Sequence, residues 1–384
     1  MPPSMEILAV TRVVIVGAGF GGLETATCLS EALGDKVAVT LIDKSDSFVL
    51  GYKKLDVMFG RIAPDTIHLP YRAIAKKGVT FRQETVTAID PGARRVTTNK
   101  GTYDADILVV ALGADYDVAA TPGLAEGGHE FYSVDAAKRL RDLLPAFGGG
   151  TVVVDVMTPH YKCPPAPSEA SMMMHDFLKA RGLRERSKII MLTPMASPLP
   201  VSKEAGDGIL ARFGELGIEC RCGVETKRID PASRTIHLSD GAAVRYDLLL
   251  AVPMHVAPKV VLESGLAVDG WIPVEKPTLK TRFPDVYAIG DVTSVGTARA
   301  GVFAERAGEI VAKEIVAKVR GGQAPRYEGD GHCYIEFGED RVAEISVNFL
   351  GGPKPTSDFK GATPGGVANK RRFGASHAAR WFGM

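Results

Sequence analysis

The chain has 384 residues, more than one hydrophobic core of ordinary size holds, and its 42 glycines and 45% hydrophobic content are typical of an α/β protein of two or three domains. A formal net charge of +1 gives no electrostatic reason to expect a nucleic-acid partner. We recognise neither a signal peptide nor an apolar run of about 18 residues, and therefore expect a cytoplasmic protein without a transmembrane helix.

The first predicted element is an apolar strand, VVIV at 13–16, followed directly by the glycine pattern GAGFGG. Gly17 permits a tight turn, Gly19 lets the backbone approach a pyrophosphate, and Gly22 lets the following helix pack closely. The next strand, VAVTLID, ends at Asp43, roughly 20 residues past the glycines, where a ribose-binding acid is expected. The pattern predicts a dinucleotide site, and FAD and NAD both fit its geometry.

Two later stretches favour FAD. DILVVALGA at 106–114 and FPDVYAIGDVTS at 283–294 resemble the two segments that complete the FAD domain of two-dinucleotide flavoproteins, and this resemblance places Asp291 beside the cofactor. The residues that we assign to the cofactor site are Gly17, Gly19, Phe20, Gly21, Gly22, Asp43, Lys44, Val86, Ala111, Gly113, Gly290, Asp291, Arg299 and Gly301.

A second strand of the same kind, TVVVDV at 151–156, lacks the glycine loop that should follow it. Met157, Thr158 and Pro159 stand where the loop glycines would be, so side chains would obstruct a pyrophosphate, and Pro159 has no amide donor. The later strands KIIMLTP and GIECRCG continue a doubly wound pattern. We expect a second Rossmann-like domain whose nicotinamide site is degenerate.

The segment KCPPAPSE, which contains Cys163 and Glu169, resembles the Cys-Pro-Pro-Gly-Pro-Tyr-Glu segment of flavocytochrome c sulfide dehydrogenase and is similar to the corresponding segment of sulfide:quinone oxidoreductases. RYEGDGHCYIEFGEDRVAEISVNF at 326–349 resembles the segment that carries their partner cysteine, here Cys333. The resemblance extends over most of the chain.

This resemblance implies a redox disulfide between Cys163 and Cys333 beside a flavin, with Glu169 as an acid or base. Sulfide or another small thiol would attack one sulfur, and the FAD would be reduced by two electrons. Because thiolates react rather than thiols, the site is expected to lower the cysteine pKa from roughly 8.5. Arg299 replaces a lysine of the family and would place a positive charge near the flavin ring.

The other cysteines, Cys28, Cys220 and Cys222, show no metal-binding spacing and are interpreted as small buried residues, so no metal site is expected. The family's third active-site cysteine is missing, and no cysteine is suited to a thioether with the flavin. We therefore expect the FAD to be held without a covalent bond.

The chain from Phe359 to its end contains basic residues and no acidic one. Phe373, His377 and Trp381 recur at helical spacing and form a partly apolar stripe. Such a tail could lie on an anionic membrane and admit a quinone, dock on the protein's own surface, or dock on a second subunit of a homodimer.

The sequence thus predicts an α/β fold of two doubly wound, Rossmann-like domains and a C-terminal segment. The expected FAD domain is discontinuous, at 8–115 and 278–320; the degenerate domain spans 116–277, and the C-terminal region spans 321–384. The expected function is FAD-dependent oxidation of sulfide or a small thiol with a quinone as acceptor, on the inner face of the cell membrane. The alternatives are an NAD(P)H-dependent flavoprotein like the type II dehydrogenases and a non-catalytic flavin redox sensor.

Overall fold

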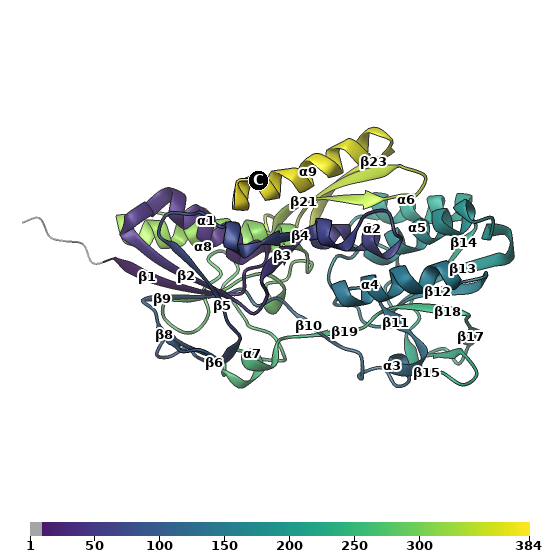
Figure 1. Cartoon of the computed structure of the whole chain (residues 1–384), viewed down its shortest axis with the longest axis horizontal. Helices are drawn as coiled ribbons and strands as arrows, with labels where there is room; N and C mark the ends of the chain where they lie inside the picture. Colours follow the sequence, from purple (N-terminus) through teal and green to yellow (C-terminus); the bar gives the residue numbers. More distant parts are fainter. Residues whose placement is uncertain (1–9) are drawn as a thin grey trace, which may run out of the picture.

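The computed structural model describes residues 10–384. The predicted start of the FAD domain at residue 8, and most of the N-terminal stretch inspected for a signal peptide, lie outside the described residues. Two parallel sheets form the body of the molecule, and a third, antiparallel sheet with the C-terminal helix lies across both (Figure 1).

The first sheet has five parallel strands in the order β20-β9-β1-β2-β5. These strands are β1 (Thr11–Val16), β2 (Val37–Asp43), β5 (Val79–Gln83), β9 (Ile107–Val110) and β20 (Val286–Ala288). The four residues of β9 and the last four of β1 are all buried, as continuous β-branched and leucine runs require when both faces of a sheet are covered. Helices α1 (Phe20–Leu33) and α8 (Gly301–Arg320) pack side by side on this sheet (Figure 1).

The second sheet also has five parallel strands, in the order β11-β18-β12-β13-β14. They are β11 (His129–Glu130), β12 (Gly150–Val156), β13 (Ser187–Thr193), β14 (Ile218–Cys222) and β18 (Leu248–Val252). Its main helices are α4 (Val134–Leu143), α5 (Ala166–Ala180) and α6 (Lys203–Leu216). Both sheets follow the parallel, doubly wound pattern, so the predicted fold class is confirmed; the predicted domain boundaries stay a prediction.

Smaller elements extend and connect the two sheets. One antiparallel sheet consists of β6 (Val86–Asp90), β7 (Arg95–Thr98) and β8 (Thr102–Asp104), and another of β15 (Thr226–Asp230), β16 (Thr235–Leu238) and β17 (Ala243–Arg245). The remaining short elements are β3 (Ser47–Val49), β4 (His68–Pro70), α2 (Lys54–Met58), α3 (Leu124–Gly127) and α7 (Lys259–Glu263). The strands β10 (Asp115–Asp117) and β19 (Met254–Val256) pair with each other where the chain passes from one sheet to the other and returns (Figure 1).

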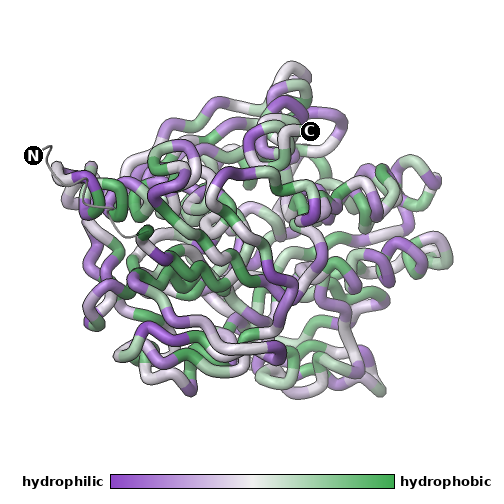
Figure 2. The backbone as a smooth tube through the Cα atoms, turned by 60° about the vertical axis from the view of Figure 1, so that its left-hand side comes forward, coloured by the Kyte–Doolittle hydropathy of each residue, from purple (hydrophilic) through white to green (hydrophobic). Residues whose placement is uncertain are grey.

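The C-terminal part forms a cover over both sheets. Its antiparallel strands are β21 (Asp330–Glu336), β22 (Val342–Asn348) and β23 (Thr356–Thr363), and the chain ends in α9 (Gly365–Phe382). β21 contacts α8 of the first sheet and α5 of the second, which brings Cys333 to the junction between them. Hydrophobic stretches run through the interior and hydrophilic stretches gather on outer loops and helices (Figure 2). Within residues 10–384 no helix is long and apolar enough to span a membrane.

Candidate active site

The glycine loop after β1 has the geometry of a dinucleotide site. A Cβ at Gly17, where φ is +98°, would lie 2.3 Å from the carbonyl oxygen of Ala111, and a Cβ at Gly22 would lie 1.9 Å from that of Gly17, so both positions exclude side chains. By contrast, a Cβ at Gly19 would have no neighbour within 4 Å. The loop is tightly packed except where a pyrophosphate would approach, as the spacing predicts.

Asp43 holds this loop through its carboxylate. One oxygen accepts the backbone N–H of Ala18 at 2.8 Å, and the other accepts that of Ser45 at 2.9 Å. Each carboxylate oxygen has a second lone pair, so a ribose hydroxyl could still be bound. Asp43 therefore fits the predicted ribose role and also stiffens the turn.

A cavity of about 290 Å³ lies between the first sheet, the second sheet and β21. Predicted residues that line it are Gly19, Phe20, Gly21, Ala111, Gly113, Cys163, Glu169, Gly290, Asp291, Gly301 and Cys333. Gly17 and Gly22 pack the turn instead, and Asp43, Lys44, Val86 and Arg299 are not among the lining residues. Most of the sites predicted separately along the chain thus meet in one space.

The loop between β12 and α5 leaves no phosphate site of the usual kind. Nine residues, 157–165, separate the strand from the helix, and Pro165 and Pro167 lack backbone N–H groups at its start. The N–H of Ala166 donates to the carbonyl oxygen of Cys163 at 2.9 Å, so this first-turn donor is already used. The same loop carries Cys163 into the cavity.

Both cavity cysteines are free thiols in the structure. Burial, followed by the charges of Glu169 and Cys333, raises the pKa of Cys163 well above its usual value. Burial and Glu169 likewise raise the pKa of Cys333, to about 11. The expectation that the site lowers the thiol pKa is therefore wrong for this dithiol state, because loss of hydration and a neighbouring carboxylate both disfavour a thiolate.

Two buried lysines that the sequence analysis missed supply positive charge to the cavity. Lys54 donates to the carbonyl oxygen of Tyr132, and burial followed by the charge of Lys162 lowers the pKa of Lys54 to about 8. Lys162 donates to the carbonyl oxygen of Ala114, and its ammonium lies 4.6 Å from the ring centre of Tyr116. The sequence CPP at 163–165 indicates a functional cysteine, but no local sequence pattern predicts that the side chain of Lys54 lines the cavity.

His255, also missed, is held as a neutral acceptor. Its Nδ1 lies 2.9 Å from the carbonyl oxygen of Pro253 and must carry the proton, which leaves Nε2 to accept the N–H of Lys162 at 3.2 Å. Burial lowers the pKa of His255 to about 3. The ring thereby fixes the loop that leads into Cys163. This role could not be predicted from the sequence, because it depends on β19 lying beside that loop.

Asp291 and the start of α8 complete the cavity wall. Burial raises the pKa of Asp291, although Lys162, Arg299 and Lys54 oppose the shift. α8 has 20 residues, its N-cap residue Ala300 provides no side-chain acceptor, and its first turn contains no acid. Its free N–H groups and the helix dipole therefore favour an anionic or carbonyl group in the cavity.

Arg299 is not among the residues that line the cavity, so its predicted place near a flavin ring stays a prediction. Its guanidinium stacks on Trp271, 3.8 Å from the ring centre, and it lines a second cavity of about 420 Å³. Its Nε donates to the carbonyl oxygen of Asp291 at 3.1 Å. The ring of the partly exposed Trp271 lies outside the first cavity and binds the planar cation. In the described chain, Lys54 and Lys162 are the cations that line the first cavity.

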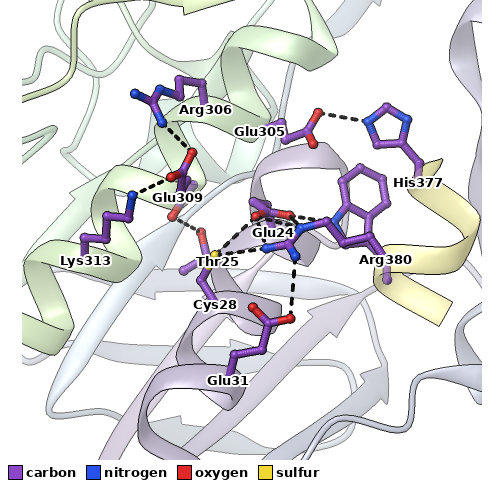
Figure 3. A network of polar contacts seen from close by, with 12 residues as sticks. Glu24, Thr25, Cys28, Glu31, Glu305, Arg306, Glu309, Lys313, His377 and Arg380 are labelled. Atoms are coloured by element: carbon purple, nitrogen blue, oxygen red, sulfur yellow. Dashed lines mark hydrogen bonds and ion pairs between the residues drawn. The ribbon is translucent and has the colours of Figure 1, made fainter. Parts of the chain in front are cut away.

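The aromatic stripe of the tail docks on its own chain. Trp381 is fully buried and His377 is 3% exposed. The indole N–H of Trp381 donates to Glu24 at 2.8 Å. Arg380 pairs with Glu24 at 2.6 Å, and His377 lies 2.9 Å from Glu305 (Figure 3). The stripe is therefore not free to lie on a membrane, and docking on the protein's own surface is the alternative that the structure supports. Phe373, one helical turn before His377, reaches the cavity lining.

Parallel sheets, a glycine loop and two cavity cysteines define the class of two-dinucleotide disulfide oxidoreductases. The family model for pyridine nucleotide-disulphide oxidoreductases matches residues 11–308. This chain belongs to that family, and is an oxidoreductase of a type that uses a flavin.

Comparisons with individual proteins are consistent with the resemblance seen in the sequence. A mitochondrial sulfide:quinone oxidoreductase of Dictyostelium discoideum is 26% identical over 358 residues, which is 88% of this chain and 78% of that protein. The structure of the sulfide:quinone oxidoreductase of Aquifex aeolicus superimposes with a TM-score of 0.87 at 22% identity, covering 97% of this chain and 92% of that one. A type II NADH:quinone oxidoreductase of Staphylococcus aureus is 34% identical, but over only 131 residues, 34% of this chain and 33% of that protein.

Proposed function

We propose that this chain is an FAD-dependent oxidoreductase that oxidises sulfide, or a small thiol, at Cys163 and Cys333 and delivers the electrons to a quinone. One observation carries the proposal: the two cysteines come from the loop after β12 and from β21, yet line the same cavity as the glycine loop and Asp291. The long, nearly full-length similarity to sulfide:quinone oxidoreductases supports it.

The residues present fit an FAD, because Gly19 leaves room for a pyrophosphate and the start of α8 offers free N–H groups to the ring. When bound, FAD would accept an electron pair from the sulfur centre and pass it on to the quinone. The two cavity cysteines are assigned to the redox chemistry, and we propose that FAD is held non-covalently. Denaturation should release it, and flavin that stays on the denatured chain would contradict this part.

In the oxidised state Cys163 and Cys333 would form a disulfide. Hydrosulfide would attack one sulfur, which forms a new S–S bond, breaks the old one and leaves the other cysteine as a thiolate. Glu169 would accept the remaining S–H proton, and Lys54, whose charge lowers the pKa of Cys163, would stabilise the thiolate. The high pKa values of Cys163 and Cys333 keep both thiols protonated in the dithiol state, so free thiolate does not accumulate there.

The aromatic part of the cavity wall suits a quinone. Tyr52 and Phe373 both line it, with their rings 5.6 Å apart. In the described part of the chain the hydroxyl of Tyr52 is buried and has no hydrogen-bond partner, so it could donate to a quinone carbonyl. A quinone dissolves in lipid, so the proposal includes peripheral contact with the cytoplasmic face of a membrane, with the exposed Arg371 and Arg372 of α9 as candidate contacts. Because the aromatic stripe docks within its own chain, we give it no role in a homodimer.

The main alternative is reduction by NAD(P)H. Against it stand the prolines at the start of α5 and the hydrogen bond between Ala166 and Cys163, which leave little of a phosphate site.

The second alternative, a redox sensor, differs from the proposed enzyme in that it would not turn over. Steady-state reduction of a soluble quinone by sulfide would support the enzyme, whereas a single round of flavin reduction without quinone turnover would support the sensor.

A further inference from the structure

A buried group of charged side chains surrounds Glu169 where α5, α2, β21 and α9 meet. The ammonium of Lys370 on α9 lies 2.7 Å from a carboxylate oxygen of Glu336 and 3.8 Å from Oε1 of Glu169. The same Oε1 of Glu169 accepts the backbone N–H of Glu336 at 2.9 Å. We call Glu169, Glu336, Lys370 and the neighbouring Asp56 the Lys370 cluster.

Glu169 joins the cluster to the cavity that contains the cysteines, and Arg61 joins the cluster to solvent. The side chain of Lys370 is 13% exposed and that of Glu169 is 7% exposed, whereas that of Arg61 is 32% exposed. Arg61 lies 3.9 Å from Asp56, 3.9 Å from Glu336 and 3.2 Å from Asp176. Arg61 and Asp176 line a hollow on the surface, so a chain of charged groups leads from Glu169 to water.

The charges of this group are not balanced. Four carboxylates face Lys370 and Arg61, because Asp176 also pairs with Arg61. Full ionisation would leave a net negative charge in a largely buried place, and a carboxyl there tends to keep a proton. Burial raises the pKa of Glu169, and Lys370 is the strongest of the groups that lower it. Burial also raises the pKa of Asp56, again opposed first by Lys370. Lys370 is thus the main group that favours the ionised form of Glu169.

Other titratable groups around the cluster act more weakly or differently. Cys163, Cys333 and Tyr132 lie near enough to Glu169 for its charge to raise their pKa values. The charge of Lys370 acts to lower the pKa of Tyr52, and the charge of Lys53 acts to lower the pKa of Asp56. Burial lowers the pKa of Lys370, but Glu169 and Glu336 more than reverse this, so Lys370 stays protonated. No other lysine or arginine in the described chain lies within 4.0 Å of the Glu169 carboxylate.

We propose that Lys370 is a positioning residue that keeps Glu169 ionised as the proton acceptor of the sulfur chemistry. The inference rests on the proposed function and adds to it a residue of α9, beyond the part of the chain that the family model matches. When an S–H bond of the substrate breaks, its electron pair stays on sulfur and the proton goes to the carboxylate of Glu169. From there the proton leaves through Glu336 and Asp56 to water at Arg61 and Asp176.

The test compares Lys370→Gln, which keeps a hydrogen-bond donor but removes the charge, with Lys370→Arg, which keeps the charge. Arg371→Gln removes an exposed charge from the next position of the same helix and is the matched control. Infrared difference spectra would follow the protonated-carboxyl band of Glu169 against pH, with Glu169→Gln identifying the band. In Lys370→Gln we expect the protonated-carboxyl band of Glu169 to disappear at a pH at least about one unit higher than in the wild type. This shift corresponds to a tenfold gain in the proton affinity of Glu169. Lys370→Arg and Arg371→Gln should titrate like the wild type.

The second readout is the pH profile of single-turnover flavin reduction by sulfide. In Lys370→Gln its acid limb should move to higher pH while the plateau is largely kept, and Lys370→Arg should restore the limb. A Lys370→Gln band that titrates at the wild-type pH would overturn the proposal, as would a uniform loss of rate without a shift. The infrared titration needs no sulfide, so a wild type that sulfide fails to reduce would refute the proposed function while the band still decides the role of Lys370.

Discussion

The backbone N–H of Cys163 donates a hydrogen bond of 2.7 Å to the carbonyl oxygen of Arg299, and this contact fastens the cysteine loop of the second sheet to the segment that leads into α8. Cys163 has a φ of +50° there, a left-handed conformation that costs a non-glycine residue roughly 1–3 kcal/mol. The surrounding structure holds the loop in this strained form. The position of the thiol is thus set by backbone contacts, which a change of side chain should leave intact.

Replacement of either cavity cysteine by serine should therefore keep the fold and the FAD content and abolish sulfide-driven flavin reduction. Serine nearly preserves the volume but cannot exchange sulfur, and the loss of a residue that acts as part of a unit costs several orders of magnitude in rate. Anaerobic stopped-flow spectroscopy of Cys163→Ser and Cys333→Ser measures this. Cys220→Ser is the control, since Cys220 lies outside the cavity, 3.5 Å from the sulfur of Cys222. Normal rates in both cavity variants would exclude the disulfide mechanism.

Gly19→Ala should fold normally and bind FAD at least about tenfold more weakly, which corresponds to about 1.4 kcal/mol. The new methyl group meets no protein atom within 4 Å, so its only expected clash is with the pyrophosphate. Flavin content after dialysis reports the loss of FAD binding, and the thermal midpoint of the apoprotein reports any effect of the substitution on folding. Gly101→Ala, equally free of contacts and remote from the loop, should retain full FAD. Equal FAD affinity in both variants would mean that the pyrophosphate lies elsewhere.

The sequence predicts those parts of the site that depend on local backbone geometry. The glycine loop, the end of β9 at Ala111 and Gly113, and the turn at Gly290 and Asp291 all reach the cavity as expected, because short motifs fix such turns. The inward lysines could not be predicted, since the burial of Lys54 and Lys162 depends on how the two sheets meet. The stacking of Arg299 on Trp271 could not be predicted either, because the two residues are distant along the chain.

The C-terminal helix shows the same limit. Its amphipathic stripe is visible in the sequence, but the acids that receive it are not: Glu24 is on α1 and Glu305 on α8. Only the tertiary structure shows that the buried carboxylate of Glu24 binds Arg380 and the Trp381 indole. These contacts favour docking of the aromatic stripe on its own chain over contact of the stripe with a membrane.

Trp381→Ala should lower the free energy of unfolding by about 3–5 kcal/mol, because a fully buried indole is lost and Glu24 loses a hydrogen-bond donor. Urea unfolding followed by circular dichroism gives the change. Arg371→Ala, on the exposed face of α9, should stay within about 0.5 kcal/mol of the wild type. A Trp381→Ala variant as stable as Arg371→Ala would show that the tail is not docked in solution.

Asp155, at the end of β12, gives a prediction about pH and stability. It is 1% exposed, and burial raises its pKa to about 7, although a hydrogen bond from Thr226 opposes the shift. The folded protein thus binds this proton more tightly than the unfolded chain, whose aspartate pKa is about 4. Unfolding releases the proton between these two values, so the stability contributed by Asp155 is present at low pH and is lost as the pH rises through about 7.

Asp155→Asn cannot ionise, so its stability relative to the wild type should improve by about 2–3 kcal/mol between about pH 5 and pH 8. Urea midpoints at the two pH values measure the difference. The same substitution at the exposed Asp240, Asp240→Asn, is the matched control. A pH-independent difference between Asp155→Asn and the wild type would mean that this carboxyl does not titrate in the folded state as predicted.

The most direct test of the proposed function is anaerobic stopped-flow bleaching of the bound flavin by sulfide and by NADH, side by side on the same wild-type protein. The two cavity cysteines and the obstructed start of α5 predict fast reduction by sulfide and slow or no reduction by NADH. Fast reduction at micromolar NADH together with no response to sulfide would contradict the account and would assign the chain to the NAD(P)H-dependent flavoproteins.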